Sequence, residues 1–436
     1  MKSLFLIQNL AIKYAKFSLN KSLKSQLNLD LLPNYQTKTP DPNINYMLYV
    51  HVPFCHTFCP YCSFHKYAYD ESLAKEYFKN LRLEMEQIYK LGYKFNSMYV
   101  GGGTTLINES ELIKTLELAK KLFNIDEISC ESDPNHIEIQ NLNRFKGLIK
   151  RLSIGVQSFN DEILKKVGRY DKFGSSQTLI TKLKNAINVL PITSIDLIFN
   201  FPNQTKDMLI NDINLAKSID ADQITFYPLM KSSLTKDKIA SALGLSKNDN
   251  EYEFYTIIEE SFKDYYKSNA WSYAKKKLAL NDEYVSSKHE YLGIGSGGFS
   301  FLNGELFINA FNLNEYNSKI QNHQSSIIAN CKFNKKERIK YLFLTEIFSG
   351  FIDISKFNQT NNTDLLKMLN IELKLLKLIK AIKIQNNIIQ STQFGRYLWL
   401  SLMKEFYTGM DRVRAIFKDD SKIKNSSKIN IMKTQI

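Results

Sequence analysis

Three of the five cysteines in this chain of 436 residues lie within eight positions, in the segment HVPFCHTFCPYCSF (51–64). Cys55, Cys59 and Cys62 have the spacing C-x3-C-x2-C. Three clustered thiols cannot all close into disulfides, so the pattern favours a reduced compartment and metal chemistry. A structural zinc ion normally takes four protein ligands, and no second cysteine knuckle follows in the sequence. The spacing therefore predicts a [4Fe–4S] cluster on these three thiolates, with the fourth iron open to another ligand.

A zinc site is the main alternative, because three histidines flank the cluster and one of them could supply a fourth ligand. These histidines are His51, His56 and His65. The two remaining cysteines, Cys130 and Cys331, have no clustered neighbours. We expect both to be buried structural thiols, since free cysteine commonly packs as a small apolar residue.

The stretch YVHVPFCHTFCPYC, which begins at Tyr49, resembles the radical S-adenosylmethionine (SAM) superfamily. The resemblance implies that the methionine moiety of SAM chelates the open iron, and that SAM is cleaved reductively to a 5′-deoxyadenosyl radical. The tyrosine-led motif is similar to one branch, the oxygen-independent coproporphyrinogen III oxidases and their relatives. It implies a catalytic place beside the sulfonium for Tyr49, for which ordinary strand packing is the alternative. It also implies an electron donor such as a flavodoxin or ferredoxin.

The elements that must position this loop alternate between strands and helices from residue 47 to about 230. Apolar runs predict six strands: Met47–Val52, Ser97–Val100, Glu127–Glu131, Leu152–Val156, Thr193–Phe199 and Gln223–Tyr227. Amphipathic segments between them predict helices, for example Leu73–Leu91, Glu109–Phe123, Ser175–Leu190 and Lys206–Ile219. Such alternation indicates an α/β fold with a parallel sheet. Six units are too few for a closed eight-fold barrel, and the resemblance implies a partial (β/α)6 barrel of radical SAM type.

Active sites of such barrels lie at the carboxyl ends of the strands, and each notable motif follows a predicted strand. The motif GGGTT follows the second strand, where glycines would let the backbone approach a ligand and free its amides for a carboxylate. The resemblance assigns Gly102, Gly103 and Thr104 to the amino-acid end of SAM; a tight turn is the alternative. Thr105 stands where the family usually has proline.

Other side chains at the same strand ends are candidates for contacts with SAM by the same resemblance. Carboxylates suit ribose hydroxyls, the arginine of GRYD matches one that reaches the SAM carboxylate, and a tyrosine could stack on adenine. Instead of contacting SAM, these side chains could cap helices, form surface ion pairs or pack in the core. These candidates are Tyr61, Glu131, Gln157, Arg169, Asp196 and Met230.

The pattern divides the chain into five units. Residues 1–45 predict an amphipathic helix and an extension, and 46–232 the barrel core. Barrel-closing helices, a glycine-rich loop and a hairpin follow in 233–333. In 334–417, helices, a hairpin turning at Asn386–Asn387 and a last helix predict a smaller winged-helix-like unit. We expect the lysine-rich residues 418–436 to be a loose tail.

The net charge of +14 favours anionic partners without choosing among them. No apolar run is long enough to span a membrane, so we expect a cytoplasmic protein. The start mimics a signal peptide but lacks a small-x-small cleavage site. Its apolar residues share one helical face, which we expect to pack onto the body of the protein: Leu4, Ile7, Leu10, Ala11 and Tyr14.

The resemblance predicts a radical SAM oxidoreductase, similar to coproporphyrinogen III dehydrogenases, that acts on a porphyrin or heme. Those oxidases carry a fourth cysteine where this chain has Phe64. A first alternative is a heme chaperone, a branch that shares this phenylalanine; of its HN-x-x-YW heme-binding stretch only His289 remains as a candidate axial ligand. A second is an anaerobic heme-degrading enzyme.

A nucleic-acid-binding protein is a hypothesis of another class, based on the basic charge and the winged-helix-like unit. It requires basic residues along one recognition helix. The last helix instead mixes basic and acidic residues, for example Lys404 and Arg412 with Glu405 and Asp411. This mixing is typical of a solvated helix face.

Overall fold

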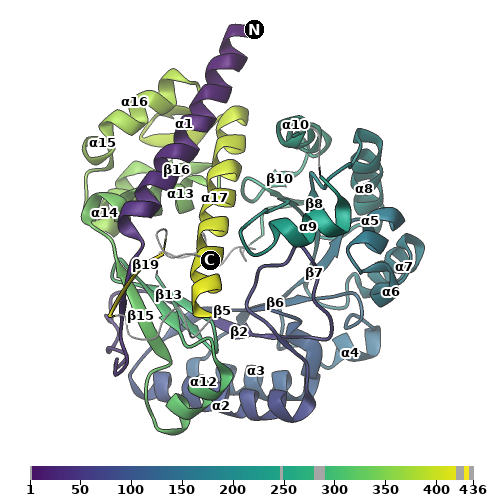
Figure 1. Ribbon diagram of the computed structural model, residues 1–436, viewed down its shortest axis with the longest axis vertical. Coiled ribbons are helices and arrows are strands. Elements are labelled where there is room, and N and C mark those ends of the chain that lie inside the picture. Colours follow the sequence, from purple (N-terminus) through teal and green to yellow (C-terminus); the bar gives the residue numbers. More distant parts are fainter. Residues whose placement is uncertain (1, 246–248, 279–289, 419–426, 432–436) are drawn as a thin grey trace.

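The computed structural model describes residues 2–245, 249–278, 290–418 and 427–431. A mixed sheet of 14 strands runs through it, and its seven neighbouring parallel strands are β12 (Tyr291–Ile294) and the six strands of the predicted barrel core (Figure 1). These six are β2 (Tyr46–Val52), β5 (Phe95–Gly102), β6 (Glu127–Ser132), β7 (Arg151–Gln157), β8 (Ile192–Phe199) and β9 (Gln223–Pro228). Every residue of β2 is buried, as expected for a parallel strand covered on both faces. All six predicted strands are confirmed.

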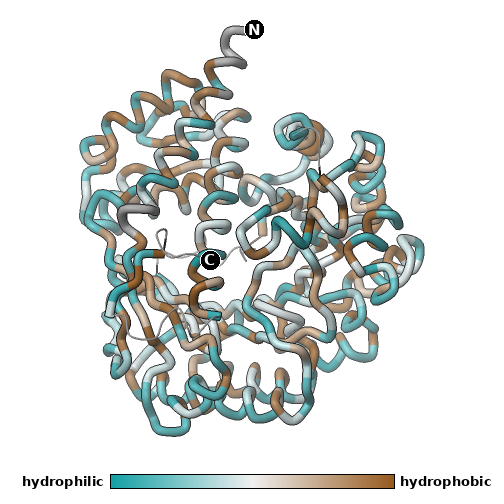
Figure 2. Tube along the Cα trace, viewed as in Figure 1, coloured by the Kyte–Doolittle hydropathy of each residue, from teal (hydrophilic) through white to brown (hydrophobic). Residues whose placement is uncertain are grey.

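Helices connect successive parallel strands and cover the sheet. The longer ones are α2 (Glu71–Lys90), α3 (Glu109–Phe123), α7 (Ser176–Ala186) and α8 (Lys206–Ile219); shorter ones are α4 (Ile139–Asn143), α5 (Asp161–Lys166) and α6 (Tyr170–Phe173). Helices α3 and α8 have the predicted bounds. Side-chain caps fix their starts, since Asn108 accepts from Glu111 N and Thr205 from Met208 N. Peripheral helices alternate between apolar and polar residues, consistent with one face on the core (Figure 2).

The sheet stays open and continues beyond β2 on one side and β9 on the other. Beyond β2 come β12 (Tyr291–Ile294), β13 (Phe299–Leu302), β14 (Glu305–Asn309), β15 (Ile327–Lys332), β1 (Asn28–Leu31) and β19 (Lys428–Asn430); beyond β9 come β11 (Ser272–Ala274) and β10 (Tyr266–Lys267). The predicted hairpin is confirmed as β13–β14. Helices α9 (Lys236–Leu243), α10 (Glu251–Ser261) and α12 (Leu313–Gln321) complete this part.

The C-terminal part contains helices around a small three-stranded sheet. Its elements are α13 (Lys335–Ile347), β16 (Phe351–Asp353), α14 (Ile354–Asn361), α15 (Leu365–Met368), α16 (Asn370–Leu378), β17 (Ile382–Gln385), β18 (Ile388–Ser391) and α17 (Gln393–Phe417). The hairpin β17–β18 turns at Asn386 and Asn387, whose φ values of 49° and 64° fit a left-handed turn. The predicted order of helices, hairpin and final helix is confirmed.

The N-terminal helix α1 (Lys2–Gln26) exists, but the prediction of its inward face is wrong. Ile7, Leu10 and Tyr14 are 51%, 58% and 65% exposed, whereas Ile12 is buried. The helix lies along α17, as Figure 1 shows, and Asn20 donates to Glu405 of that helix at 3.3 Å. The face of α1 that packs onto the protein is therefore the neighbouring one, which contains Ile12. Contact with α17 sets the rotation of α1 about its axis.

The tail is not loose throughout. Strand β19 pairs antiparallel with β1, and Ile429 and Ile431 are buried against the sheet. The strand that follows α1 and the last described segment of the chain therefore pair at one sheet edge. None of the helices within the described ranges combines the length and apolar character that crossing a membrane requires.

Candidate functional site

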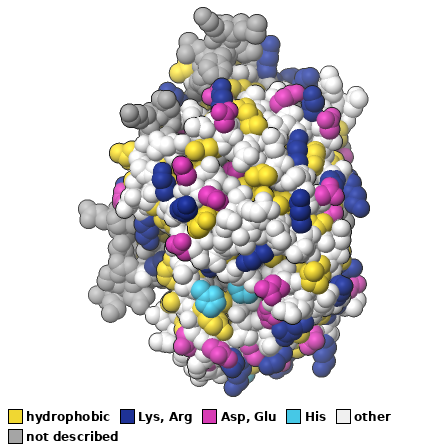
Figure 3. Space-filling model, turned by 90° about the vertical axis from the view of Figure 1, so that its right-hand side faces the viewer, with side chains coloured by type: hydrophobic (Ala, Val, Ile, Leu, Met, Phe, Trp, Pro, Cys, Tyr) yellow, Lys and Arg dark blue, Asp and Glu magenta, His cyan; other side chains and the backbone are white. Residues whose placement is uncertain are grey.

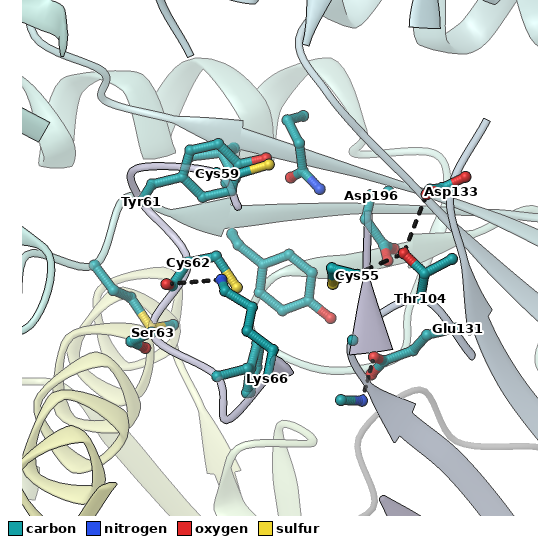
Figure 4. A pocket seen from close by; sticks show the side chains of 18 of the residues that line it. Cys55, Cys59, Tyr61, Cys62, Ser63, Lys66, Thr104, Glu131, Asp133 and Asp196 are labelled. Atoms are coloured by element: carbon teal, nitrogen blue, oxygen red, sulfur yellow. Dashed lines mark hydrogen bonds between the residues drawn. The ribbon is translucent and has the colours of Figure 1, made fainter. Parts of the chain in front are cut away.

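A cavity of about 270 Å³ opens at the carboxyl ends of the parallel strands. The cysteine loop after β2 forms one wall, the ends of β5 to β9 form the floor, and α17 contributes a further wall (Figure 4). All thirteen residues predicted for the site line this cavity: Tyr49, Cys55, Cys59, Tyr61, Cys62, Gly102, Gly103, Thr104, Glu131, Gln157, Arg169, Asp196 and Met230. The fold therefore brings together residues that are far apart in the sequence.

The three clustered cysteines are free thiols that are partly exposed to the cavity. Cys55 ends the short strand β3 (Phe54–Cys55), which pairs with β4 (Tyr67–Ala68) and so anchors the loop at both ends. Within the described part of the chain, no three Cys, His, Asp or Glu side chains are close enough to share one metal ion. Separated thiols around one cavity suit a multi-iron cluster, in which each thiolate binds a different iron.

Two of the three flanking histidines, His51 and His65, are held by structural contacts, and no histidine in the described ranges lies with two other possible ligands close enough to share one metal ion. His51 is buried: its Nε2 lies 3.0 Å from the carbonyl oxygen of His65, and its Nδ1 lies 2.8 Å from the Tyr49 hydroxyl. A carbonyl can only accept, so Nε2 carries the proton and Nδ1 accepts from Tyr49. Burial lowers the pKa of His51 to about 4 and keeps the ring neutral. His65 is also buried and lies 3.2 Å from the hydroxyl of Ser296. Both ring nitrogens of His51 and Nε2 of His65 are thus engaged in structural hydrogen bonds.

Positively charged side chains surround the thiols. Arg169 donates to the Tyr61 hydroxyl at 3.2 Å and to Cys59 Sγ at 3.7 Å, and Lys66 donates to the Cys62 carbonyl at 3.1 Å. Burial alone would raise the pKa of the Cys59 thiol, but Arg169 and Tyr61 bring that pKa below its ordinary value. Thr104 Oγ1 donates to Cys55 Sγ at 3.9 Å, but burial outweighs this bond and raises the pKa of Cys55. The site therefore favours a thiolate at Cys59 over one at Cys55.

The glycine motif has a structural role different from the one expected. Its amides are not free for a ligand: Gly102 N donates to Glu131 Oε2 at 3.2 Å, Gly103 N to Val52 O at 2.8 Å, and Thr104 N to Phe54 O at 2.7 Å. A Cβ on Gly102, whose φ is +121°, would lie 2.7 Å from the ring of His51. These residues are small because the end of β5 packs directly against the cysteine loop.

Polar side chains at the next three strand ends point into the cavity region (Figure 4). Glu131 accepts from the Tyr99 hydroxyl at 2.9 Å, and burial raises its pKa. Asp196 accepts from Ser153 Oγ at 2.7 Å. Gln157 has φ of +75°, an uncommon backbone conformation for a residue with a side chain. Strain of this kind is concentrated at functional sites, which supports a role for Gln157.

Sequence reasoning missed several residues of the cavity. Asp133 accepts from Thr104 Oγ1 at 3.1 Å and lies 2.8 Å from His136 Nδ1 and 3.4 Å from Lys172 Nζ. Although burial opposes ionisation, His136 and Lys172 hold the pKa of Asp133 well below its usual range. Asp133 could have been found from the sequence, because it belongs to the motif ESDPN at the end of the third predicted strand. No local pattern could have indicated the residues of α17 in the cavity wall, Tyr407, Asp411 and Arg414.

The other residues that the sequence singled out are two further cysteines, one histidine and Phe64. Cys130 and Cys331 are fully buried, as expected of structural thiols, and burial raises the pKa of Cys331 to about 12. His289 falls outside the described residues. Phe64 lines the cavity with its side chain 40% exposed, at the position where the oxidases are expected to have a fourth cysteine.

Comparison with known proteins agrees with this geometry. Residues 49–216 match the family model of the radical SAM superfamily. The heme chaperone HemW of Buchnera aphidicola subsp. Schizaphis graminum is 29% identical over 384 residues, 82% of this chain and 97% of that protein. The heme chaperone HemW of Bacillus subtilis is 29% identical over 62% of this chain and 74% of its own length.

A second kind of relative is the oxygen-independent coproporphyrinogen III oxidase of Escherichia coli, which is 32% identical over 41% of each chain. The solved structure of coproporphyrinogen III oxidase (HemN) from Escherichia coli superimposes with a TM-score of 0.70, at 21% identity, over 84% of this chain and 91% of that one. This match shows a shared fold and confirms the predicted radical SAM type of partial barrel.

Proposed function

We propose that this chain, in which residues 49–216 form a radical SAM domain, holds a [4Fe–4S] cluster on Cys55, Cys59 and Cys62 and uses SAM to act on a porphyrin or heme. When bound, the cluster would supply the electron that cleaves SAM to a 5′-deoxyadenosyl radical. The observation that carries this proposal is the placement of the three thiols around one cavity, with no set of described side chains close enough to form a single-ion site.

The other residues of the cavity have roles within this proposal. Arg169 stabilises the Cys59 thiolate, and Glu131 and Asp196 present carboxylates suited to the ribose hydroxyls of SAM. The hydroxyl of Tyr49 is oriented by its bond to His51, which fixes the ring at the cavity floor.

Further candidates for the SAM-binding wall are Tyr61, Gln157 and Met230, together with the packed backbone of Gly102–Thr104. A flavodoxin or ferredoxin as electron donor and a cytoplasmic location belong to the same proposal.

A heme chaperone is the second candidate, because relatives of that name align over most of this chain. Phe64 in place of a fourth cysteine also supports it. In this version the protein binds heme and delivers it unchanged. Anaerobic heme degradation is a third candidate, supported only by the short GRYD resemblance.

The nucleic-acid alternative receives little support. Most of α17 is buried, and two of its cations are paired, Lys404 with Glu251 and Arg414 with Asp411. On the face shown in Figure 3, basic side chains are interspersed with acidic ones and form no continuous track. Recognition of a nucleic-acid backbone requires such a track.

Anaerobic reconstitution with iron and sulfide, followed by dithionite and SAM, tests the proposal. Mass spectrometry would follow 5′-deoxyadenosine and the tetrapyrrole, with coproporphyrinogen III or heme present or absent. Nucleoside with an altered tetrapyrrole supports the enzyme, and binding of heme at unchanged mass supports the chaperone. The variant Cys62→Ala is the matched control. Failure of the wild-type chain to form any cluster would refute the proposal.

A further inference from the structure

Helix α17 presents one face to the cavity. Tyr407, Asp411 and Arg414, which line the cavity, are spaced four and three residues apart and therefore share a helix face. Lys418 continues this face one turn further on, and its amide donates to Arg414 O at 3.0 Å. In Figure 4 this helix, in yellow, passes beside the loop that carries Ser63. None of these residues belongs to the strand ends proposed to hold SAM.

Arg414 is held firmly at the cavity wall. Its side chain is 7% exposed, and its Nη1 donates to Asp411 Oδ1 at 2.5 Å. Its guanidinium carbon lies 5.2 Å from the ring centroid of Phe64 and 5.6 Å from that of Phe299. Ring contacts use the face of a guanidinium and leave the N–H groups of its edge available to an acceptor.

Positive charge exceeds negative charge on this wall. Lys66 and Arg414 both line the cavity, and Lys418, which is not one of the lining residues, is close enough to feel both of their charges. Desolvation and then the charges of Lys66 and Arg414 lower the pKa of Lys418 to about 8. Asp411 offsets one of the three cations, and the nearby thiolates attract Lys66, whose ammonium bonds to the Cys62 carbonyl. Among the described residues of this wall, one cation remains in excess, which indicates an anionic ligand.

The rest of the wall indicates what kind of anion fits. Phe64, Leu229, Met230 and Tyr407 give the cavity an apolar lining close to the cationic residues. A ligand with an apolar body and a carboxylate at its edge matches both the apolar lining and the positive charge of this wall. A small inorganic anion matches only the positive charge. Arginine binds carboxylates through two parallel hydrogen bonds, and this also fixes the orientation of the ligand.

We propose that Arg414 and Lys418 form a subsite for a carboxylate of the substrate, so that α17 selects tetrapyrroles that carry free propionates. This inference rests on the proposed function. In it, Phe64 supports the Arg414 guanidinium and offers its exposed edge to the macrocycle.

Binding of coproporphyrin III and of its tetramethyl ester to the reconstituted protein with SAM, in the same detergent, tests the subsite. Fluorescence titration gives each dissociation constant without turnover. We expect Arg414→Gln and Lys418→Gln each to weaken binding of the acid about tenfold, as for loss of a charged hydrogen bond, and to leave the ester unchanged. Arg414→Lys should recover part of the loss. Lys374→Gln, at an exposed lysine of α16, is the control.

Equal losses for acid and ester, or wild-type affinity in both variants, would overturn the subsite while leaving the proposed function intact. Absence of saturable binding of either porphyrin to the wild-type chain would overturn both. Removing Arg414 leaves the buried Asp411 unpaired, so the double variant Asp411→Asn/Arg414→Gln serves if the single one unfolds. Lys418 is exposed at the end of α17 although neighbouring groups partly desolvate its ammonium, so its variant tests the subsite with little effect on the folded core.

Discussion

Asp212 on α8 binds the two residues that follow Gln157 at the end of β7, and its ionisation gives a sharp prediction. The side chain is 1% exposed; Oδ1 accepts from Phe159 N at 2.7 Å and Oδ2 from Ser158 Oγ at 2.8 Å. These two partners directly follow Gln157 at the end of β7. Burial outweighs both hydrogen bonds and raises the pKa of Asp212 from 3.8 to about 7.

The sign of the effect follows from proton linkage. The pKa in the folded state lies above that of the unfolded chain, so the folded protein binds the proton more tightly. With respect to this group, stability is greatest below pH 3.8 and decreases until the pH reaches about 7. The loss is about 1.4 kcal/mol per pH unit, so that between pH 5 and pH 8 it amounts to about 3 kcal/mol.

The variant Asp212→Asn keeps an acceptor for Phe159 N and cannot ionise. We expect its free energy of unfolding, relative to the wild type, to rise by about 3 kcal/mol between pH 5 and pH 8. Because the unfolding entropy of a chain of this length is about 0.9 kcal/mol/K, the difference in Tm should grow by about 3 °C. Circular dichroism melts at both pH values measure it.

Comparing two pH values removes any constant effect of the amide on packing. Asp207→Asn, an exposed position in the first turn of the same helix, is the control and should show the same difference at both pH values. A pH-independent difference for Asp212→Asn would refute the reasoning, since the carboxylate would then have an ordinary pKa in the folded protein.

Three further predictions concern the cavity. Cys59→Ala should abolish the visible absorption of the reconstituted cluster, whereas Cys130→Ala, at a buried thiol outside the loop, should keep it. Gly103→Ala should also prevent cluster assembly, because its Cβ would collide with the backbone oxygen of Phe54; a normal spectrum would contradict this. Glu131→Gln should weaken SAM binding about tenfold in equilibrium dialysis, since an amide is a poorer acceptor for ribose hydroxyls. Unchanged affinity would exclude Glu131 from the SAM site.

Much of the fold could be predicted because its signals are local. The six parallel strands and the bounds of α3 and α8 follow from apolar periodicity, which the backbone geometry of strands and helices imposes on any window of the chain. The rotation of α1 could not be predicted in this way. Its apolar residues cover more than one face, and only the surface of α17 decides that Ile12 is buried while Leu10 is exposed.

The glycine motif also combines a feature that the sequence predicted with one that only the tertiary structure decided. Three glycines after a strand indicated a close approach of the backbone to something, and this was correct. The partner is the cysteine loop itself, since Gly103 N and Thr104 N bond to Val52 and Phe54. A sequence does not distinguish a bound ligand from a neighbouring segment as the cause of such an approach.

By itself the sequence determined which three thiols can act together, because Cys55, Cys59 and Cys62 lie on one short loop and their spacing is fixed along the chain. The tertiary structure alone decided what surrounds that loop. Arg414 follows Cys62 by about 350 residues and reaches the cavity only because one face of α17 packs against it. Contacts of such separation depend on the packing of whole elements, which local patterns do not encode.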